Sequence, residues 1–251
     1  MKNFSLKNEV ALITGGGTGL GLAMARSFVE AGARVVLVGR RKEPLKAACA
    51  ELGAAAAYRS HDVADFAQAP ALLADVEKTV GPVSILINNA GVHLKKPVAD
   101  VTENEIGYQM DIHVLGAHAL SRAAYALMKP RGQGSIIFIA SMASLFGVPL
   151  VGAYAAAKSA LLGLMRTMAV EWAPQGVRVN AIAPGWIETD ITRGAVLSDK
   201  ARLARIIQRT PMGRMGQPED VAGAAVFLCS PAAKFITGVV LPVDGGVSIG
   251  F

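Results

Sequence analysis

The sequence predicts an α/β fold in which a seven-stranded parallel sheet is doubly wound, with helices on both of its faces. Segments typical of strands alternate with segments typical of helices along the chain, as parallel strands joined by helical crossovers require. The strand segments are continuous apolar runs, which indicates that both faces of the sheet are covered. No linker, repeat or low-complexity segment interrupts the 251 residues. A single domain over 1–251 is therefore predicted.

The predicted elements follow a regular order. Strands are expected at 10–14, 33–40, 55–63, 83–91, 134–141, 177–185 and 238–246. Helices are expected at 22–33, at 42–52, in the stretch just before residue 83, at about 103–128, around Tyr154 and at 220–230. The first of them should end at Gly32, since glycine is suited to a helix C-terminal cap. The long polar stretch at about 186–218 is predicted to be a substrate loop, since loops at strand C-termini carry ligands in such sheets.

Composition narrows the possible partners. The net charge is +6, but lysines and arginines are scattered, and the longest basic run is GRRK at 39–42. Nucleic-acid binding is not expected from this pattern, and anionic ligands are only mildly favoured. No apolar run of about 18 residues occurs, so no membrane span is predicted. The N-terminal apolar run is too short for a signal peptide.

The cysteines and histidines predict neither disulfides nor a metal site. Cys49 and Cys229 lie in stretches rich in Ala or Val, which favours buried free thiols. The four histidines show no spacing typical of metal ligands. A reducing cytoplasm is the expected location.

A glycine-rich loop, TGGGTGLG at 14–21, joins the first predicted strand to the first helix. Glycine lets the backbone approach a pyrophosphate there, and a helix N-terminus favours its charge. An ordinary strand-to-helix turn is the alternative. The candidate cofactor contacts are Gly15, Gly17, Thr18, Gly19, Leu20 and Gly21.

The second predicted strand ends in Gly39, Arg40 and Arg41. An acidic residue at this point would bind a ribose 2′-hydroxyl, but none is present. Two guanidinium groups suit a 2′-phosphate instead. The pair therefore predicts NADP(H) as the cofactor, with NAD(H) as the alternative. The other interpretation is that the two arginines are only surface charges at the end of a strand.

Tyr154 and Lys158 stand out in an otherwise small and apolar stretch, SLFGVPLVGAYAAAKSALLGLM. Four residues apart, they share one helix face. A packed tyrosine with a solvated lysine is one interpretation. The other is acid–base chemistry, in which a nearby ammonium favours the phenolate of a group whose ordinary pKa is near 10.

With these motifs, the sequence resembles the short-chain dehydrogenase/reductase family over essentially its whole length. The resemblance is carried by the glycine loop, Asp62-Val63, NNAG at 88–91, Ser141, Tyr154-x-x-x-Lys158, Pro184-Gly185, Ile187 and Thr189. It implies a Rossmann-type sheet, a nicotinamide cofactor and interconversion of an alcohol and a carbonyl compound by hydride transfer. No metal is implied.

The resemblance also implies roles for individual residues. Tyr154 exchanges a proton with the substrate oxygen, Lys158 tunes it and reaches the nicotinamide ribose, and Ser141 holds the substrate oxygen. The implied cofactor contacts, beyond the glycine loop and the arginines, are Asp62, Val63, Asn89, Ala90, Gly91, Tyr154, Lys158, Pro184, Gly185, Ile187 and Thr189. The expected substrate contacts are Ser141, Ala143, Leu150 and Trp186, with His93 and Leu94 nearby.

His113 departs from the family pattern, which places an Asn there to support a proton-relaying water. A neutral imidazole can donate and accept, so the relay can survive. The imidazole could also become charged below about pH 6.5 and oppose the lysine. A mere spacer in the helix is the other interpretation, and the sequence does not choose between them.

Three functions compete at this stage. The first is an NADP(H)-dependent reductase or dehydrogenase of a secondary alcohol, on a sugar acid by loose likeness to gluconate 5-dehydrogenases. The second is a 3-oxoacyl-carrier-protein reductase. Gln175 argues against this interpretation, while Lys129 and Arg131 keep it open. The third is a non-catalytic dinucleotide-binding sensor. The resemblance and the small residues of the Tyr154 helix predict a homotetramer, with a dimer as the alternative.

Overall fold

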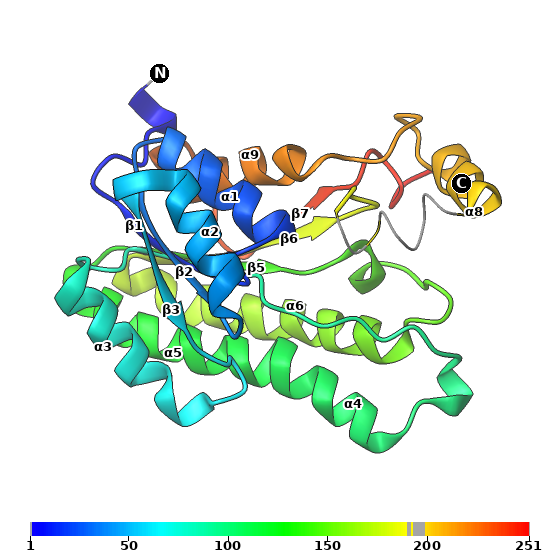
Figure 1. Ribbon diagram of the computed structural model, residues 1–251, viewed down its shortest axis with the longest axis horizontal. Helices are drawn as coiled ribbons and strands as arrows, with labels where there is room; N and C mark the ends of the chain where they lie inside the picture. Colours follow the sequence, from blue (N-terminus) through cyan, green and yellow to red (C-terminus); the bar gives the residue numbers. More distant parts are fainter. Residues whose placement is uncertain (1, 190–191, 193–198, 251) are drawn as a thin grey trace.

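The structure is a computed structural model that describes residues 2–189, 192 and 199–250. Figure 1 shows a central sheet with helices above and below it. The strands are β1 (Val10–Thr14), β2 (Arg34–Gly39), β3 (Ala56–Ser60), β4 (Ile85–Asn88), β5 (Gly134–Ile139), β6 (Val177–Pro184) and β7 (Val240–Val243). They pair in parallel in the order β3-β2-β1-β4-β5-β6-β7. The predicted seven-stranded doubly wound sheet is confirmed.

Helices cover both faces of this sheet. Those of the described residues are α1 (Gly19–Glu30), α2 (Lys42–Leu52), α3 (Ala69–Thr79), α4 (Glu103–Met110), α5 (Gly116–Met128), α6 (Gly152–Trp172), α8 (Lys200–Arg209) and α9 (Pro218–Cys229). In Figure 1, α1, α2 and α9 lie on one face, and α3, α5 and α6 on the other. None of the described helices is long and apolar enough to cross a membrane.

Two apolar cores, one on each side of the sheet, result from this layering. Along β1, Val10 and Leu12 enter one core while Ala11 and Ile13 enter the other. Every residue of β1 is buried. The continuous apolar runs of the sequence therefore have the physical cause expected of strands covered on both faces.

The sheet order also fixes where a ligand can bind. Sequential connections run outward from β1 to β2 and β3, and in the other direction from β4 to β7. Between β1 and β4 the order reverses, so their following loops diverge and leave a crevice at the C-terminal ends of the strands. The glycine loop follows β1 and the NNAG loop follows β4, so both lie at this crevice.

The chain is helical throughout 103–128, as expected, but it is not α-helical throughout. A five-residue π-helical segment, Asp111–Leu115, separates α4 from α5. Its wider turn shifts the side chains relative to an α-helix, and such insertions often occur at functional sites. The sequence prediction missed it because apolar spacing over one short turn does not distinguish the two helix types. His113 is the middle residue of this segment.

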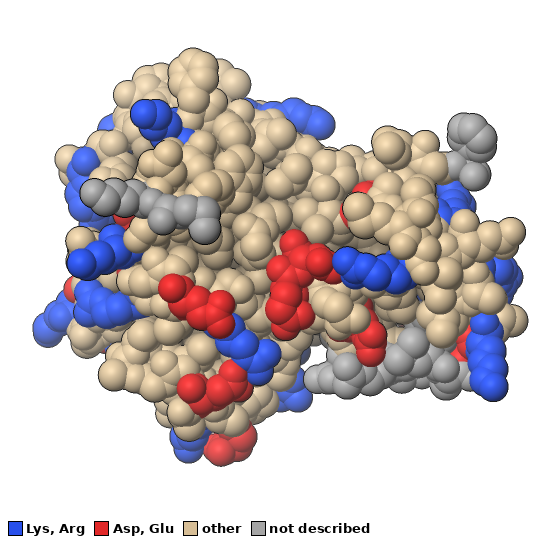
Figure 2. Space-filling model, turned by 90° about the horizontal axis from the view of Figure 1, so that it is seen from above, with Lys and Arg blue, Asp and Glu red and all other residues tan. Residues whose placement is uncertain are grey.

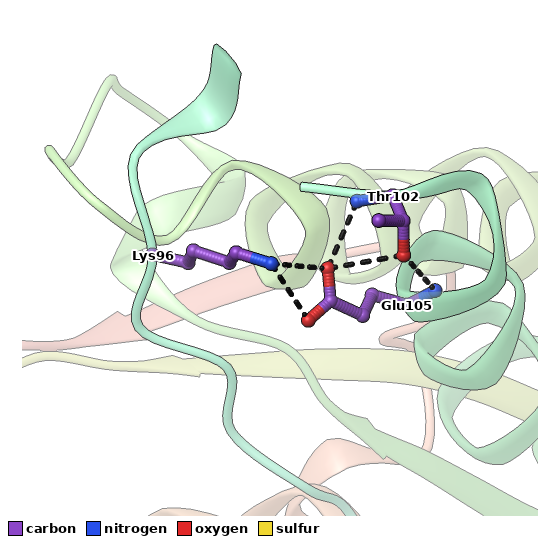
Figure 3. Close-up of polar contacts among 3 residues, drawn as sticks. All are labelled: Lys96, Thr102 and Glu105. Atoms are coloured by element: carbon purple, nitrogen blue, oxygen red, sulfur yellow. Dashed lines mark hydrogen bonds and ion pairs between the residues drawn. The ribbon is translucent and has the colours of Figure 1, made fainter. Parts of the chain in front are cut away.

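The loop between β4 and α4 is fixed at its far end. The Lys96 Nζ lies 3.0 and 2.9 Å from the two carboxylate oxygens of Glu105, as Figure 3 shows. Glu105 also completes a capping box with Thr102 at the start of α4. The backbone N–H of Lys96 donates to the Leu150 carbonyl at 2.7 Å. The chain between β4 and Lys96 is thus held at both ends.

The stretch at 186–218 is only partly the loop that its polarity predicted. It contains α8, which begins after Asp199, whose carboxylate accepts from the Arg202 N–H at 2.9 Å. Trp186 and Leu203 pack with buried Ile206 and Met215, a small apolar cluster apart from the two main cores. Residues 190–191 and 193–198 of the predicted loop lie outside the described residues.

Candidate active site

A cavity of about 460 Å³ opens at the C-terminal ends of the strands, where the sheet order reverses. It collects side chains and backbone from the ends of β1 to β6. The predicted residues that line it are Gly15, Gly17, Thr18, Gly19, Leu20, Arg40, Arg41, Asp62, Val63, Asn89, Ala90, Gly91, His113, Ser141, Tyr154, Lys158, Pro184, Gly185, Ile187 and Thr189. His93 lines it as well, and five predicted residues do not: Gly21, Leu94, Ala143, Leu150 and Trp186.

The glycine loop is shaped by backbone conformations that favour glycine. Gly15 has φ +65° and Gly19 has φ +53°, in the left-handed region. A Cβ on Gly21 would overlap the Gly15 carbonyl oxygen, so this glycine allows the first turn of α1 to pack beneath the loop. Gly21 therefore supports the glycine loop through close packing against Gly15 and does not line the cavity itself. The N-cap residue Thr18 makes no side-chain cap, which leaves the first N–H groups of α1 available to an anion.

Thr14, which sequence reasoning missed, joins the glycine loop to the NNAG loop. Its buried hydroxyl accepts from the N–H groups of Asn89 and Ala90, both at 2.9 Å, and donates to the Ile87 carbonyl at 3.2 Å. The Asn89 amide donates to the Thr14 carbonyl at 2.8 Å. A threonine ending an apolar strand just before a glycine run was the available signal.

The two arginines lie at one end of the cavity. The Arg40 guanidinium is 3.9 Å from the Asp62 carboxylate, and its side chain is 59% exposed. An ion pair this long and this exposed contributes little to stability, so Arg40 can turn to another anion. Arg41 precedes α2 and is also exposed. His61, another lining residue that the sequence analysis missed, lies beside Asp62.

Ser141, Tyr154 and Lys158 meet at the other end. Ser141 follows β5, and its hydroxyl accepts from the Ala143 N–H at 3.1 Å. Tyr154 and Lys158 lie one turn apart on α6, with the lysine Nζ 5.7 Å from the centre of the phenol ring. Lys158 is buried and donates to the Ile139 carbonyl at 2.6 Å. The predicted trio is therefore brought together across two elements.

Burial controls the acidity of this pair. It lowers the pKa of Lys158 to about 7. Burial also raises the pKa of Tyr154, against a smaller opposite effect of the Ser141 hydroxyl. In the protein by itself, burial thus decides the direction in which the pKa of Tyr154 moves. The physical reason is that removal of water disfavours the charged phenolate, and it disfavours the charged form of Lys158 in the same way.

His113 lies behind Tyr154 and faces it edge-on, with ring centres 5.4 Å apart and an interplanar angle of 84°. Its Nε2 lies 2.8 Å from the Val92 carbonyl oxygen and 3.2 Å from the Val92 backbone nitrogen, so the tautomer decides whether this ring nitrogen donates to the carbonyl or accepts from the N–H. Burial, then the charge of Lys158, lowers the pKa of His113 to about 3. Of the alternatives that the sequence left open for His113, burial therefore favours the neutral imidazole over the charged one.

His113 also lines a second, very small cavity. Its Nδ1 has no hydrogen-bond partner among the described residues, and neither has the Oδ1 of Asn88. Both residues and Lys158 line a space of about 10 Å³, close to the volume that one water requires. His113 is thus adjacent to both Tyr154 and Lys158. A residue that served only as a spacer in the helix would not need this position.

The expected substrate contacts are scattered more widely. His93 lines the cavity beside Tyr154. Ala143 is buried behind Ser141, and Leu150, which is 42% exposed, adopts φ +69°. Trp186 packs toward α8. The other lining residues that sequence analysis missed are largely apolar or backbone contributors: Val38, Gly39, Pro44, Leu45, Val92, Ile112, Ile139, Ala140 and Thr192. No cluster of potential metal ligands occurs among the described residues.

Residues 15–248 match the family described as enoyl-(acyl carrier protein) reductase, a group of short-chain enzymes. The chain is 40% identical to galactitol 2-dehydrogenase (L-tagatose-forming) of Cereibacter sphaeroides, over 98% of this chain and 97% of that protein. The chain belongs to the short-chain dehydrogenase/reductase family. It is also 37% identical to gluconate 5-dehydrogenase of Gluconobacter oxydans, over 98% of this chain and 97% of that one.

A solved short-chain dehydrogenase supports the same assignment. The gluconate 5-dehydrogenase of Burkholderia cenocepacia, solved with NADP and tartrate, superposes with a TM-score of 0.95 at 37% identity, covering 100% of this chain and 99% of that one. The chain is therefore an oxidoreductase that uses a nicotinamide cofactor and a small-molecule substrate. Its cavity fits such a dinucleotide, because a glycine cradle and open helix N–H groups lie at its centre and two arginines at one end.

Proposed function

We propose that this short-chain dehydrogenase interconverts a secondary alcohol and its ketone on a polyhydroxylated substrate, with a sugar acid as the preferred class and NADP(H) as the preferred cofactor. The observation that carries the proposal is the convergence of Ser141, Tyr154 and Lys158 on a cavity that also contains the glycine cradle. A substrate oxygen beside Tyr154 and Ser141 would lie next to the dinucleotide site. The relatives named for galactitol and gluconate support a polyol or sugar-acid substrate.

In this mechanism the bound nicotinamide supplies or accepts the hydride, and the protein moves the proton. Tyr154 donates its phenolic proton to the carbonyl oxygen during reduction and removes it from the alcohol during oxidation. The Ser141 hydroxyl hydrogen-bonds to the same oxygen and fixes its position. Lys158, with a pKa lowered to about 7, can hold or release a proton near neutral pH and so support the phenol in either direction.

A 3-oxoacyl-carrier-protein reductase remains the second candidate function. The two basic residues that favoured it, Arg131 and Lys129, make contacts within the chain. Arg131 donates to the Glu77 carboxylate and to the Val83 carbonyl, both at 2.7 Å, so its role is structural. Lys129 lies over the Tyr125 ring at 5.9 Å. The deciding experiment is reduction by NADPH of a panel of keto sugar acids, ketoses, simple ketones and 3-oxoacyl thioesters. We expect the highest kcat/KM with a keto sugar acid; a preference for the acyl thioester would favour the second candidate.

Cofactor preference gives a direct prediction. Replacing Arg40 and Arg41 together by Ala should weaken NADPH binding by about 10- to 100-fold, the usual worth of charged hydrogen bonds to a phosphate. NADH binding should change by less than about threefold, because NADH carries no 2′-phosphate. Fluorescence titration of both cofactors measures this. Equal losses for NADPH and NADH would show that the arginines do not recognise the 2′-phosphate.

We also propose that the enzyme is a cytoplasmic homotetramer. The outer side of α6 carries Ala156, Gly163 and Val170, the last 77% exposed, while Ala157 faces inward and is buried. Small and apolar residues on an exposed helix face suit close packing across a two-fold axis. Light scattering at micromolar protein should give four times the chain mass of 26.0 kDa. A mass of one chain would contradict the assembly.

A further inference from the structure

His93 lies in the site but takes no part in the proton transfer assigned to Tyr154, Ser141 and Lys158. It lies five residues after β4 and lines the cavity. Its ring centre is 5.1 Å from that of Tyr154, with an interplanar angle of 46°. The phenol is therefore flanked by two imidazoles, His93 on the cavity side and His113 on the buried side.

The two imidazoles differ in what they have left to bind. The Nε2 of His113 is engaged by the backbone of Val92, whose carbonyl oxygen and N–H both lie within hydrogen-bonding distance of it. His93 makes no hydrogen bond with any residue that the structure describes, and its ring is exposed to the cavity. Both of its nitrogens can therefore interact with a molecule bound beside Tyr154.

The surroundings keep His93 neutral at physiological pH. Partial burial, then the positive charges of Arg202 and Lys95, lowers the pKa of His93 below its ordinary value. A neutral imidazole has one nitrogen that donates and one that accepts. A hydroxyl group has the same pair of capacities, so it is the matching partner. Figure 2 shows lysines and arginines spread over this face of the molecule, with some of them at the end where α8 lies.

The backbone on either side of His93 is held in place. Val92, its neighbour, bonds to His113, and Lys96 is fixed to Leu150 and Glu105, the last contact being visible in Figure 3. A polar group that is positioned before the substrate arrives discriminates better between substrates, because less ordering is required on binding.

We propose that His93 is a specificity-determining residue that binds a hydroxyl on the carbon next to the reacting carbonyl carbon. The proposal rests on the proposed function, in which Tyr154 and Ser141 hold the carbonyl oxygen. With the carbonyl oxygen there, the adjacent carbon can present its hydroxyl to the tilted imidazole of His93 beside Tyr154. The ligand class is an α-hydroxyketone, or the vicinal diol in the oxidative direction.

The experiment compares two ketones that differ by this hydroxyl alone, 1-hydroxy-2-butanone and 2-butanone. His93→Phe keeps a ring against Tyr154 and removes both nitrogens. We expect kcat/KM with NADPH to fall about 10- to 100-fold for the hydroxyketone and less than about threefold for 2-butanone. His93→Gln, which retains a donor and an acceptor, should restore part of the preference. The control is His118→Phe, since His118 lies on α5 outside the cavity and should leave the ratio unchanged.

The outcomes separate the two claims. Equal losses for both ketones in His93→Phe, or no loss for either, would overturn the role of His93 while leaving the proposed function intact. Absence of turnover by the native enzyme with any ketone and NADPH would instead remove the proposed function and this inference together. NADPH affinity, measured by fluorescence, should be the same in all variants, which shows that each one has folded.

Discussion

Tyr154→Phe is expected to lower the rate of ketone reduction by about 10²–10⁴-fold, the usual contribution of a positioned proton donor. The change removes one hydroxyl and keeps the ring between His93 and His113. NADPH affinity should change by less than about twofold, because the glycine cradle and the arginines lie elsewhere in the cavity.

Two measurements on the same preparations check this result: NADPH binding by fluorescence, and turnover of the preferred ketone. Tyr125→Phe is a matched control, since Tyr125 lies outside the cavity, stacked on Trp172. A Tyr154→Phe enzyme that keeps more than about a tenth of native turnover would be incompatible with proton transfer by this residue.

Lys158→Met is expected to act in two ways at once. Turnover should fall at least about 100-fold, since the neighbour that supports proton exchange by Tyr154 is lost. NADPH binding should weaken too, because Lys158 lines the cofactor cavity while Met offers no donor. Loss of both properties distinguishes this variant from Tyr154→Phe. Unchanged NADPH affinity would limit Lys158 to a role in the chemical step.

The same variant should change how stability depends on pH. Lys158 has a pKa of about 7 in the folded enzyme and 10.5 as its ordinary value. Between these values the unfolded chain binds more protons than the folded one, so this group makes stability rise with pH, at a slope of at most roughly 1.4 kcal/mol per pH unit. Below pH 7 both states are protonated and the slope vanishes.

Denaturant unfolding of native enzyme and Lys158→Met at pH 7.5, 8.5 and 9.5 measures this difference. We expect the free energy of unfolding of the native enzyme to rise relative to that of the variant across the series. Parallel pH profiles for the two proteins would mean that burial of Lys158 does not depress its pKa.

The sequence predicted those parts of the fold and site that depend on residues close together in the chain. Unbroken apolar runs such as Val10–Thr14 are strands covered on both faces, and the glycine loop lies at the first strand-to-helix junction as expected. Because parallel strands end at the same edge of the sheet, residues after six different strands share one cavity. Most residues of the family motifs therefore line this one cavity.

What the sequence missed depends on contacts between distant segments. The π-helical turn at His113 is a local change in hydrogen bonding that apolar spacing does not reveal. The tie between Thr14 and the NNAG loop joins residues 75 positions apart. Electrostatics were missed for the same reason: the burial that lowers the pKa of Lys158 and His113 comes from the packed environment rather than from their neighbours in sequence.

The central claim is that this enzyme transfers a hydride between NADPH and a ketone carbon. Its most direct test is reduction of the preferred ketone with NADPH deuterated at the transferred position of the nicotinamide, followed by mass spectrometry and NMR of the product. We predict one deuterium per molecule, bound to the carbinol carbon, and none at the hydroxyl after exchange in water. A product alcohol without carbon-bound deuterium, or no alcohol from any ketone of the panel, would contradict the account.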